Sequence, residues 1–358
     1  QGDVGSGKTI VAVFALIQAV ENNFQAAIMA PTEILARQHL QNFTHYLESL
    51  NIQIAYLSGS QNTQERMEQL SLVESGQAKV VIGTHALFQE SVNFKNLSLV
   101  IIDEQHKFGV HQRLSLTKKA NSTPHQLVMT ATPIPRSLTM SAYADLDTSV
   151  IDELPPGRQK VETIALNNAR RDELITKIRK ISDEGRQIYW VCTLIEESEA
   201  LRAESAEKTF NYLKDHLNDL TVVMIHGRLS KPEKESIMKD FENGRINLLV
   251  ATTVIEVGVN VPNASLMIVE NAERLGLAQL HQLRGRVGRG SEKSICILMY
   301  QSPLSSNARE RLDILRQSND GFMIAQKDLE LRGPGEILGT QQTGIASMKI
   351  ANIVRDAY

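Results

Sequence analysis

The first nine residues constrain the fold more than any other stretch of the chain. Residues 2–9 read G-D-V-G-S-G-K-T, which matches the phosphate-binding pattern G-x-x-x-x-G-K-T. Glycines let backbone amides wrap a phosphate chain, because a Cβ would block the approach and φ is often positive there. The apolar run 10–17 favours a buried helix whose N-terminal dipole strengthens the anion site. The pattern predicts a nucleotide-binding α/β domain; a flexible turn before an ordinary helix is the alternative.

The residue types of this loop predict a division of tasks. We expect Gly5, Ser6 and Gly7 to contact the phosphates of ATP. Lys8 can reach the β- and γ-phosphates, and the hydroxyl of Thr9 can hold Mg²⁺. A loop of this kind follows a buried strand, and the chain begins one residue before the motif. We therefore expect the strand that carries the loop to belong to a longer parent protein.

Composition is that of a globular protein with room for two domains. The chain has 358 residues, of which 42% are hydrophobic and 22% charged. No run of about 18 apolar residues is present, so we expect no membrane span. The net charge of −3 gives no sign of a nucleic-acid partner, which must be argued from local clusters. Cys192 and Cys296 lie in apolar runs and are expected to be buried free thiols.

Short β-branched runs alternate with helical segments, which predicts parallel sheets with crossover helices. Strands are expected at 25–30, 79–82, 97–102, 126–129, 161–166, 188–192, 222–225, 248–251, 266–269 and 295–300. Helices are expected at 33–50, 196–216 and 305–317. The prolines and glycine of 154–158 can continue neither element. They predict a linker at 154–160 between a first domain at 1–153 and a second at 161–302, with 303–358 as an appendage.

A second motif ends an apolar strand in two carboxylates. Residues 100–106 read V-I-I-D-E-Q-H, and ligands bind at the carboxyl ends of parallel strands. We expect Asp103 to bind Mg²⁺ and Glu104 to orient and deprotonate the attacking water. A solvated strand end is the alternative, but the upstream phosphate loop favours catalysis. Residues 130–133, T-A-T-P, follow the next strand and are candidates to relay between the nucleotide site and the second domain.

A third motif, Q-L-R-G-R-V-G-R-G at 282–290, interleaves arginines with glycines. Arg286 and Arg289 are the candidates to stabilise charge on the γ-phosphate, a role worth ~10³–10⁵ in rate. Gln282 is assigned to the nucleotide site. A basic loop that contacts a nucleic-acid backbone is the alternative, and Arg284 is a candidate for that contact.

These motifs fall in different halves of the chain. Lys8 and the two carboxylates lie in the first half, whereas Arg286 and Arg289 lie in the second. We expect one ATP site that two domains complete, so that hydrolysis requires closure and product release permits opening. This organisation is typical of a motor.

The ordered motifs resemble those of superfamily 2 helicases. They are GDVGSGKT, PTEILARQ, GTHAL, DEQH, TATPIPR, ATTVIEVGVNVPNA and QLRGRVGRG. The segment DEQHKFGVHQR and the tail from RLDILRQSND to GTQQTG resemble the RecG family of branched-DNA helicases. The resemblance implies an α/β fold of two RecA-like parallel-sheet domains in tandem, then a helical hairpin and loop, with a wedge domain upstream. It implies ATP hydrolysis coupled to translocation on DNA, which remodels stalled forks and Holliday junctions in recombination and repair.

Further residues match functional positions of the family. Positions that touch the DNA backbone are matched by Thr32, Gly83, Thr84, Thr252 and Thr253. Positions that couple ATP state to movement are matched by Arg311, Arg332 and Gln342. Hydroxyls and loop amides hold phosphates without reading bases, although ordinary capping is the alternative for the threonines. Asn260 replaces a family Asp, which weakens any ribose or arginine contact there, and Gln341 replaces an Arg of some relatives.

The resemblance also implies cofactors, partners and a location. The cofactors are ATP and Mg²⁺, and the partners are branched and double-stranded DNA, with single-strand DNA-binding protein as a further candidate. A monomer in the bacterial cytoplasm, associated with the nucleoid, is implied. Two alternatives stay open: an Mfd-type transcription-repair coupling translocase, which would need an upstream polymerase-binding module, and a nucleotide-binding switch without productive turnover.

Overall fold

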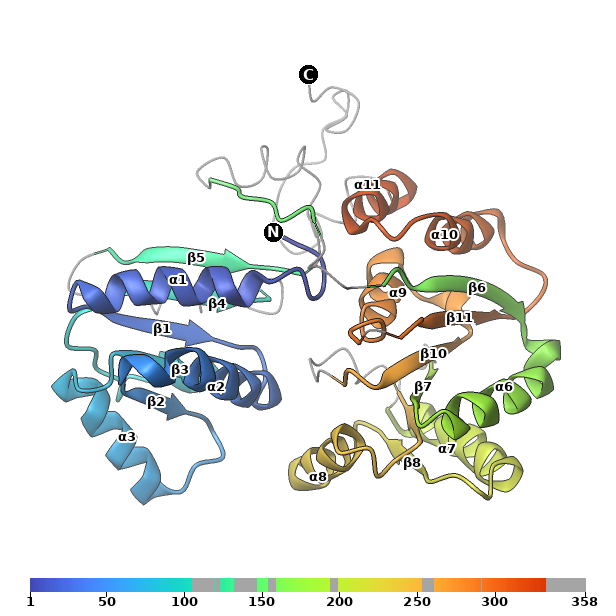
Figure 1. The fold of residues 1–358 in the computed structure, drawn as a ribbon, viewed down its shortest axis with the longest axis horizontal. Coiled ribbons are helices and arrows are strands. Elements are labelled where there is room, and N and C mark those ends of the chain that lie inside the picture. Colours follow the sequence, from blue (N-terminus) through green and yellow to red (C-terminus); the bar gives the residue numbers. More distant parts are fainter. Residues whose placement is uncertain are drawn as a thin grey trace. The chain divides into compact units, whose positions relative to one another are not determined.

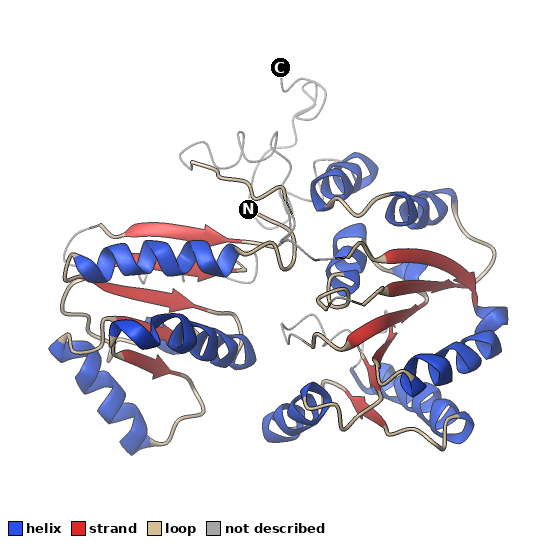
Figure 2. Ribbon diagram, viewed as in Figure 1, coloured by secondary structure: helices blue, strands red, loops and turns tan. Residues whose placement is uncertain are grey.

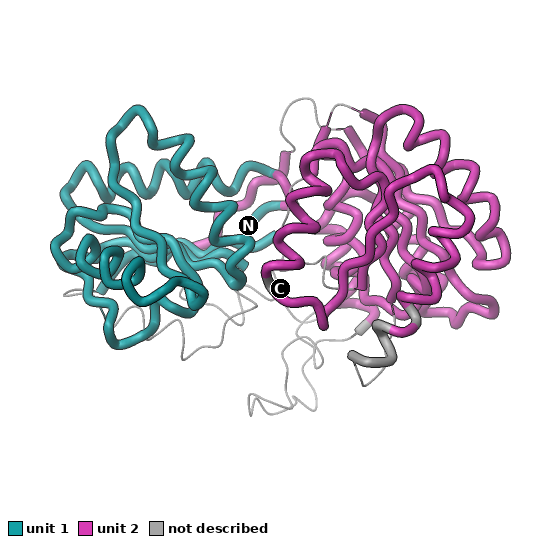
Figure 3. Tube along the Cα trace, turned by 90° about the horizontal axis from the view of Figure 1, so that it is seen from below, with its two compact units in different colours: residues 1–2, 6–131, 257–259 teal, residues 3–5, 132–256, 260–358 magenta. Residues whose placement is uncertain are grey.

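The computed structural model describes residues 1–104, 119, 123–131, 147–153, 159–193, 199–252, 261–290 and 292–332. The chain forms two compact units, shown in Figure 3. The first contains residues 1–2 and the described part of 6–131, and the second contains 3–5 and the described residues from 147 to 332. Each unit is a parallel sheet with helices on its faces (Figures 1 and 2), which confirms the predicted α/β fold class.

Five parallel strands form the sheet of the first unit, in the order β2-β3-β1-β4-β5. They are β1 (Gln25–Met29), β2 (Ile54–Leu57), β3 (Val80–Gly83), β4 (Leu97–Asp103) and β5 (His125–Met129). The register pairs Ile28 of β1 with Ile82 of β3 and Ile101 of β4. These central strands are continuous apolar runs because both of their faces are covered.

Different elements cover the two faces of this sheet. Helices α1 (Lys8–Glu21) and α2 (Glu33–Leu47) bury Leu16 and Phe43 against one face. Helix α3 (Thr63–Ser75) and the 3-10 turn η2 (His85–Phe88) contribute Val73 and Leu87 to the other. A 3-10 turn, η1 (Glu48–Leu50), continues α2.

Six parallel strands form the sheet of the second unit, in the order β6-β11-β10-β7-β9-β8. They are β6 (Glu162–Asn167), β7 (Gln187–Cys192), β8 (Val222–Ile225), β9 (Leu248–Ala251), β10 (Ala264–Glu270) and β11 (Ile295–Tyr300). All seven residues of β10 are buried, as expected for a strand near the centre of a covered sheet.

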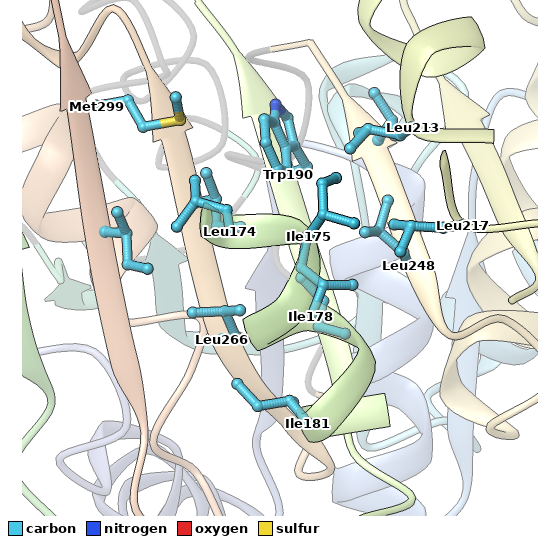
Figure 4. Close-up of a cluster of buried hydrophobic side chains, with 14 of the residues drawn as sticks. Leu174, Ile175, Ile178, Ile181, Trp190, Leu213, Leu217, Leu248, Leu266 and Met299 are labelled. Carbon is cyan, nitrogen blue, oxygen red and sulfur yellow. The ribbon is translucent and has the colours of Figure 1, made fainter. Parts of the chain in front are cut away.

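Helices α6 (Arg171–Asp183) and α7 (Glu199–His216) cover one face of this sheet. Figure 4 shows Ile175 and Ile178 of α6 packed around Trp190 and Leu248 of the sheet. On the opposite face, Phe241 of α8 (Lys231–Glu242) stacks edge-on against Tyr189, with ring centroids 4.8 Å apart. The 3-10 turns η4 (Asn168–Arg170) and η6 (Ala272–Arg274) precede α6 and α9.

Three helices form a cluster beside the second sheet. Helix α9 (Leu277–Arg284) carries the third motif, and α10 (Ser306–Gln317) and α11 (Gly321–Arg332) form a hairpin that packs against it (Figure 1). The hairpin is the one that the resemblance implied. In the part of the chain that the structure describes, no helix combines the length and apolar character needed to cross a bilayer.

Each predicted strand is present with limits within two residues of those expected. The predicted helix 33–50 is divided into α2 and η1, and the other two predicted helices correspond to α7 and α10. Elements β2, α3, α6, α8 and α9 were not predicted. Residues 154–158 of the predicted linker lie outside the described residues, and the domain limits stay predictions.

Candidate active site

The glycine-rich segment forms a loop that ends at the N-terminus of α1. Gly5 and Gly7 have φ of 73° and 95°, a region that side chains disfavour. Gly7 is the N-cap of α1 and brings no side chain to cap it, so the first amides of the helix face the loop. The buried hydroxyl of Ser6 makes no hydrogen bond to any described residue. Helix amides and an unpartnered hydroxyl fit the phosphates of a nucleotide.

The two residues that follow begin α1. The ammonium of Lys8 lies over the loop and donates a hydrogen bond to the carbonyl of Gly2, at 2.9 Å. Thr9 is half-buried one position later. Figure 1 shows the N-terminus of α1 at the same edge of the first sheet as the carboxyl ends of its strands. A cation and a hydroxyl therefore share an edge with the carboxylates at the end of β4.

Asp103, the last residue of β4, is held by a histidine that the sequence analysis did not identify. His39 Nε2 lies 2.9 Å from Asp103 Oδ2, and both side chains are largely buried. The other oxygen, Asp103 Oδ1, accepts the amide of Glu104 at 3.1 Å. Both carboxylate oxygens of Asp103 are therefore held by hydrogen bonds, Oδ2 by the ring of His39 and Oδ1 by the amide of Glu104.

Glu104 is positioned by strand register. Asp103 pairs with Met129 of β5, so the residues that follow the two strands are neighbours. Glu104 Oε2 accepts the amide of Ala131, at 3.4 Å, which joins the second motif to the T-A-T-P segment. The backbone of Glu104 has φ of 51°, which is uncommon for a residue with a side chain and marks a strained position.

The residues described here do not make a metal site by themselves. Among them, no group of three or more His, Cys, Asp or Glu side chains is placed to hold a metal ion. Thr9 and Asp103 offer two oxygen ligands of the kind that Mg²⁺ prefers. They fit a Mg²⁺ ion that takes its remaining ligands from nucleotide phosphates and water.

The arginines of the third motif follow the end of α9 in the second unit. Arg286 is 9% exposed, and the half-buried Arg289 donates from Nε to the carbonyl of Gly285 at 3.2 Å. Burial raises the pKa of the Tyr189 phenol on β7, and the positive charges of Arg286 and Arg289 act to lower it. Gln282 is half-buried on α9. Both guanidinium groups therefore act electrostatically on Tyr189 of the sheet.

Arg284 is not placed to contact a nucleic-acid phosphate, contrary to expectation. Its side chain is 3% exposed and donates to the carbonyls of Leu315 and Ser318 at 2.8 and 2.7 Å. A third bond reaches His281 Nδ1 at 2.9 Å. Burial lowers the pKa of Arg284, although a guanidinium stays protonated near neutral pH. The residue ties α9 to α10.

The residues matched to DNA contacts lie at the ends of elements. Thr32 is the N-cap of α2, and its hydroxyl accepts the amide of Leu35 at 3.4 Å. Gly83 ends β3, where a Cβ would overlap the carbonyl of Leu57. Thr84 and Thr252 follow β3 and β9, and both are buried.

The coupling positions are described in part. Arg311 of α10 donates to the carbonyls of Glu273 and Leu275, at 3.0 and 2.8 Å. Arg332 ends α11, and its side chain lies outside the described residues. Outside them altogether are Thr253, Asn260, Gln341 and Gln342.

Three family models match the chain. The model for DEAD/DEAH box helicases matches residues 1–141, and that for the helicase conserved C-terminal domain matches 170–291. The model for domain 3 of the ATP-dependent DNA helicase RecG, C-terminal part, matches 318–358.

Curated relatives resemble the chain over almost all of its length. An ATP-dependent DNA helicase RecG of Escherichia coli is 60% identical over 99% of this chain and 52% of the relative. The Bacillus subtilis RecG is 46% identical, with the same coverage of both chains. The chain therefore spans about half the length of the curated relatives it matches.

Solved structures show the same likeness. A RecG bound to a three-way DNA junction superimposes with a TM-score of 0.80 at 44% identity, over 99% of this chain and 46% of that one. The helicase MrfA bound to DNA and AMPPNP reaches a TM-score of 0.68 over 98% of this chain and 56% of that one. Its 16% identity supports the shared fold alone.

Proposed function

Because the chain belongs to the RecG family of ATP-dependent DNA helicases, we propose that it is the motor of an enzyme that translocates on double-stranded DNA. The enzyme remodels branched DNA, such as stalled replication forks and Holliday junctions, in recombination and repair. The observation that carries this proposal is 60% identity to a RecG over 99% of the chain. A similar RecG was solved bound to a three-way DNA junction, which supports branched DNA as the substrate.

ATP binds at the phosphate loop in this proposal. Gly5, Ser6 and Gly7 surround the phosphates, and Lys8 exchanges its bond to the carbonyl of Gly2 for the β- and γ-phosphates. The hydroxyl of Ser6 has no hydrogen-bond partner among the described residues, which supports this assignment. Thr9 and Asp103 would hold Mg²⁺, which neutralises developing charge on the phosphate oxygens.

Hydrolysis uses the carboxylate after Asp103. Glu104 takes the proton of the attacking water, and its bond from the amide of Ala131 holds the side chain near the end of β5. Arg286 and Arg289 stabilise the charge on the γ-phosphate during transfer, and Gln282 contacts the nucleotide. Because the arginines belong to the second unit, turnover depends on both units.

DNA contacts and coupling complete the cycle. The backbone of the duplex is held by Thr32, Gly83, Thr84, Thr252 and Thr253. Movement is coupled to ATP state by Arg311, Arg332 and Gln342. Arg311 is anchored on the segment before α9, which supports a link between the hairpin and the ATP site.

The protein works as a monomer at the bacterial nucleoid, with single-strand DNA-binding protein as a further partner. Bacterial relatives that act on DNA support this location. No observation favours the Mfd-type translocase or a nucleotide switch. Release of a stalled RNA polymerase by the protein would favour the first of these.

Unwinding of a synthetic three-way junction by the protein with its natural termini tests the proposal. We expect ATP-dependent strand separation that Glu104→Gln abolishes while junction binding persists. We also expect Arg332→Ala to keep most of its ATPase activity and lose unwinding. Strand separation at the wild-type rate by Glu104→Gln would contradict the assigned role.

A further inference from the structure

Two arginines join α9 to the α10–α11 hairpin, one at each end of α9. Arg311 of α10 donates to main-chain carbonyls just before α9, as described above. Arg284, the last residue of α9, donates to carbonyls at the end of α10, of which Leu315 lies in the last turn and Ser318 is the C-cap. Figure 1 shows the three helices adjacent to one another. The resemblance assigned a role to Arg311 but none to Arg284.

The position of Arg284 suits the end of a helix. Carbonyls in the last turn of α10 lack partners within the helix and carry its negative dipole. A guanidinium placed there satisfies two of them and neutralises that charge. Its burial is expensive, because Arg284 is 3% exposed and keeps its charge. An apolar side chain could be buried at this position with a smaller loss of solvation free energy. We therefore look for a role of the charged group other than packing.

The other side of Arg284 leads to the phosphate loop. Its Nη2 donates to His281 Nδ1 at 2.9 Å, and His281 Nε2 lies 2.8 Å from Asp3 Oδ1. A guanidinium can only donate, so Nδ1 of the ring must accept and the ring proton is on Nε2. Nε2 then donates to the carboxylate. The directions of all these hydrogen bonds are therefore fixed.

Asp3 belongs to the phosphate loop, residues 2–9. Its Oδ1 also accepts the amide of Val4, at 2.6 Å. Residues 3–5 pack with the second unit, where a Cβ at Gly285 would lie 3.0 Å from Val4. A chain of hydrogen bonds therefore runs from Asp3 of the loop, through His281 and Arg284, to the end of α10.

We propose that Arg284 and His281 are positioning residues that couple the state of the phosphate loop to the α10–α11 hairpin. The proposal rests on the proposed motor function. A change at the loop moves Asp3, and the hydrogen-bonded path transmits that movement to the hairpin. The hairpin leads directly into residues 333–358, which include the coupling position Gln342.

The test compares ATP hydrolysis with unwinding in the protein with its natural termini. The variants are Arg284→Lys, His281→Ala and the double variant. Lysine keeps the charge but cannot reach both carbonyls and the ring together. His281→Ala leaves the bonds to α10 intact, so it serves even if the Arg284 variant folds poorly. Arg316→Lys, an exposed arginine of α10 paired with Asp313, is the matched control.

We expect DNA-stimulated ATPase close to the wild type in both single variants, with unwinding of a three-way junction lower by about tenfold. Unwinding by the double variant should be no slower than unwinding by the less active single variant, because both residues act in one path. Thermal melting shows whether each variant is folded. A purely structural role would lower ATPase and unwinding in the same proportion, and that result would overturn the proposal.

Two other outcomes count against the proposal and separate it from the function itself. A wild type that unwinds, with folded variants that unwind equally well, would overturn the coupling role and leave the motor function standing. A wild type without ATP-dependent unwinding would overturn the proposed function and this inference with it.

Discussion

The imidazole of His39 lies 2.9 Å from the carboxylate of Asp103, Nε2 to Oδ2. His39 follows Thr32, the N-cap of α2, by seven residues, which is about two turns of helix. One rigid element therefore joins a residue proposed to hold the DNA backbone and the ring that orients an acidic residue of the ATP site. The other ring nitrogen is buried and has no partner among the described residues.

Replacing His39 with Ala is expected to impair the use of Mg²⁺. Partners that orient a metal-binding carboxylate contribute about 10- to 100-fold to metal affinity or activity. We expect DNA-stimulated ATPase of His39→Ala to fall by about tenfold at limiting Mg²⁺ and to recover in part at high Mg²⁺. Mg²⁺-dependent binding of a fluorescent ATP analogue gives a second readout. His45→Ala, at an exposed position of α2, is the control, and the same Mg²⁺ dependence in both variants would remove the role.

Lys8→Ala and Glu104→Gln are expected to separate binding from turnover. Lys8→Ala removes the cation of the phosphate loop, so ATP affinity and turnover should both be lost. Glu104→Gln keeps its shape and its acceptor for the amide of Ala131, so ATP should still bind while turnover stops. Calorimetric titration and steady-state ATPase measure the two effects. Glu74→Gln, at an exposed position of α3, should match the wild type. Normal turnover in Glu104→Gln would refute its role as the base.

Gly83→Ala is expected to destabilise the first unit, because the added Cβ would overlap the carbonyl of Leu57. Forcing extra volume into a packed site costs about 1–3 kcal/mol. Urea denaturation measures the loss. Gly59→Ala is the matched control, because its Cβ would meet its nearest neighbour, Glu33 Oε1, at 3.8 Å. Equal stability of the two variants would show that close packing does not explain this glycine.

Stability is expected to fall at alkaline pH because of the buried thiol of Cys296. Burial raises the pKa of Cys296 from 9.0 to about 12. Below the lower value the thiol is protonated in both states and contributes nothing to pH dependence. Between the two values the unfolded thiol ionises and the folded one does not, so the free energy of unfolding falls by about 1.4 kcal/mol per pH unit. The burial of Cys192 raises its pKa as well.

The comparison of wild type with Cys296→Ala isolates this effect. Between about pH 8 and pH 10.5, the wild type should lose up to about 2 kcal/mol more stability than the variant. Chemical denaturation at both pH values measures the difference. Parallel losses in the two proteins would show that the thiol ionises as easily when folded.

The strands were predictable because strands that are buried on both faces appear in the sequence as unbroken apolar runs. Strands such as β4 are unbroken apolar runs because helices cover both faces, and such runs are visible in the sequence. Helix α3 is different: Val73 is its one buried residue, so no apolar stripe marks it. Strand β2 is four residues long and alternates between half-buried and buried positions, which is a weak signal.

The sequence motifs predicted the site residues that lie within them, but not the histidines that flank them. His39 lies one residue after the segment 31–38, and His281 lies one residue before 282–290. His39 meets Asp103 because α2 packs against the sheet. His281 meets Arg284 because the two residues are one turn apart on α9. Neither contact follows from residue type, because a histidine on a helix is more often an ordinary core or surface residue. Arg284 was misread for the converse reason: its neighbours suggested a basic loop, whereas it lies in the packed end of α9.

The central claim is that ATP turnover needs Arg286 and Arg289 of the second unit in addition to Lys8 and the carboxylates of the first. Arg286→Ala tests it most directly, with nucleotide affinity and single-turnover hydrolysis measured on the same preparation. Arg245→Ala, an exposed arginine of the second unit paired with Asp240, is the control. The account predicts that Arg286→Ala binds ATP nearly as well as the wild type and hydrolyses it about 10³-fold more slowly. Hydrolysis at the wild-type rate would contradict it.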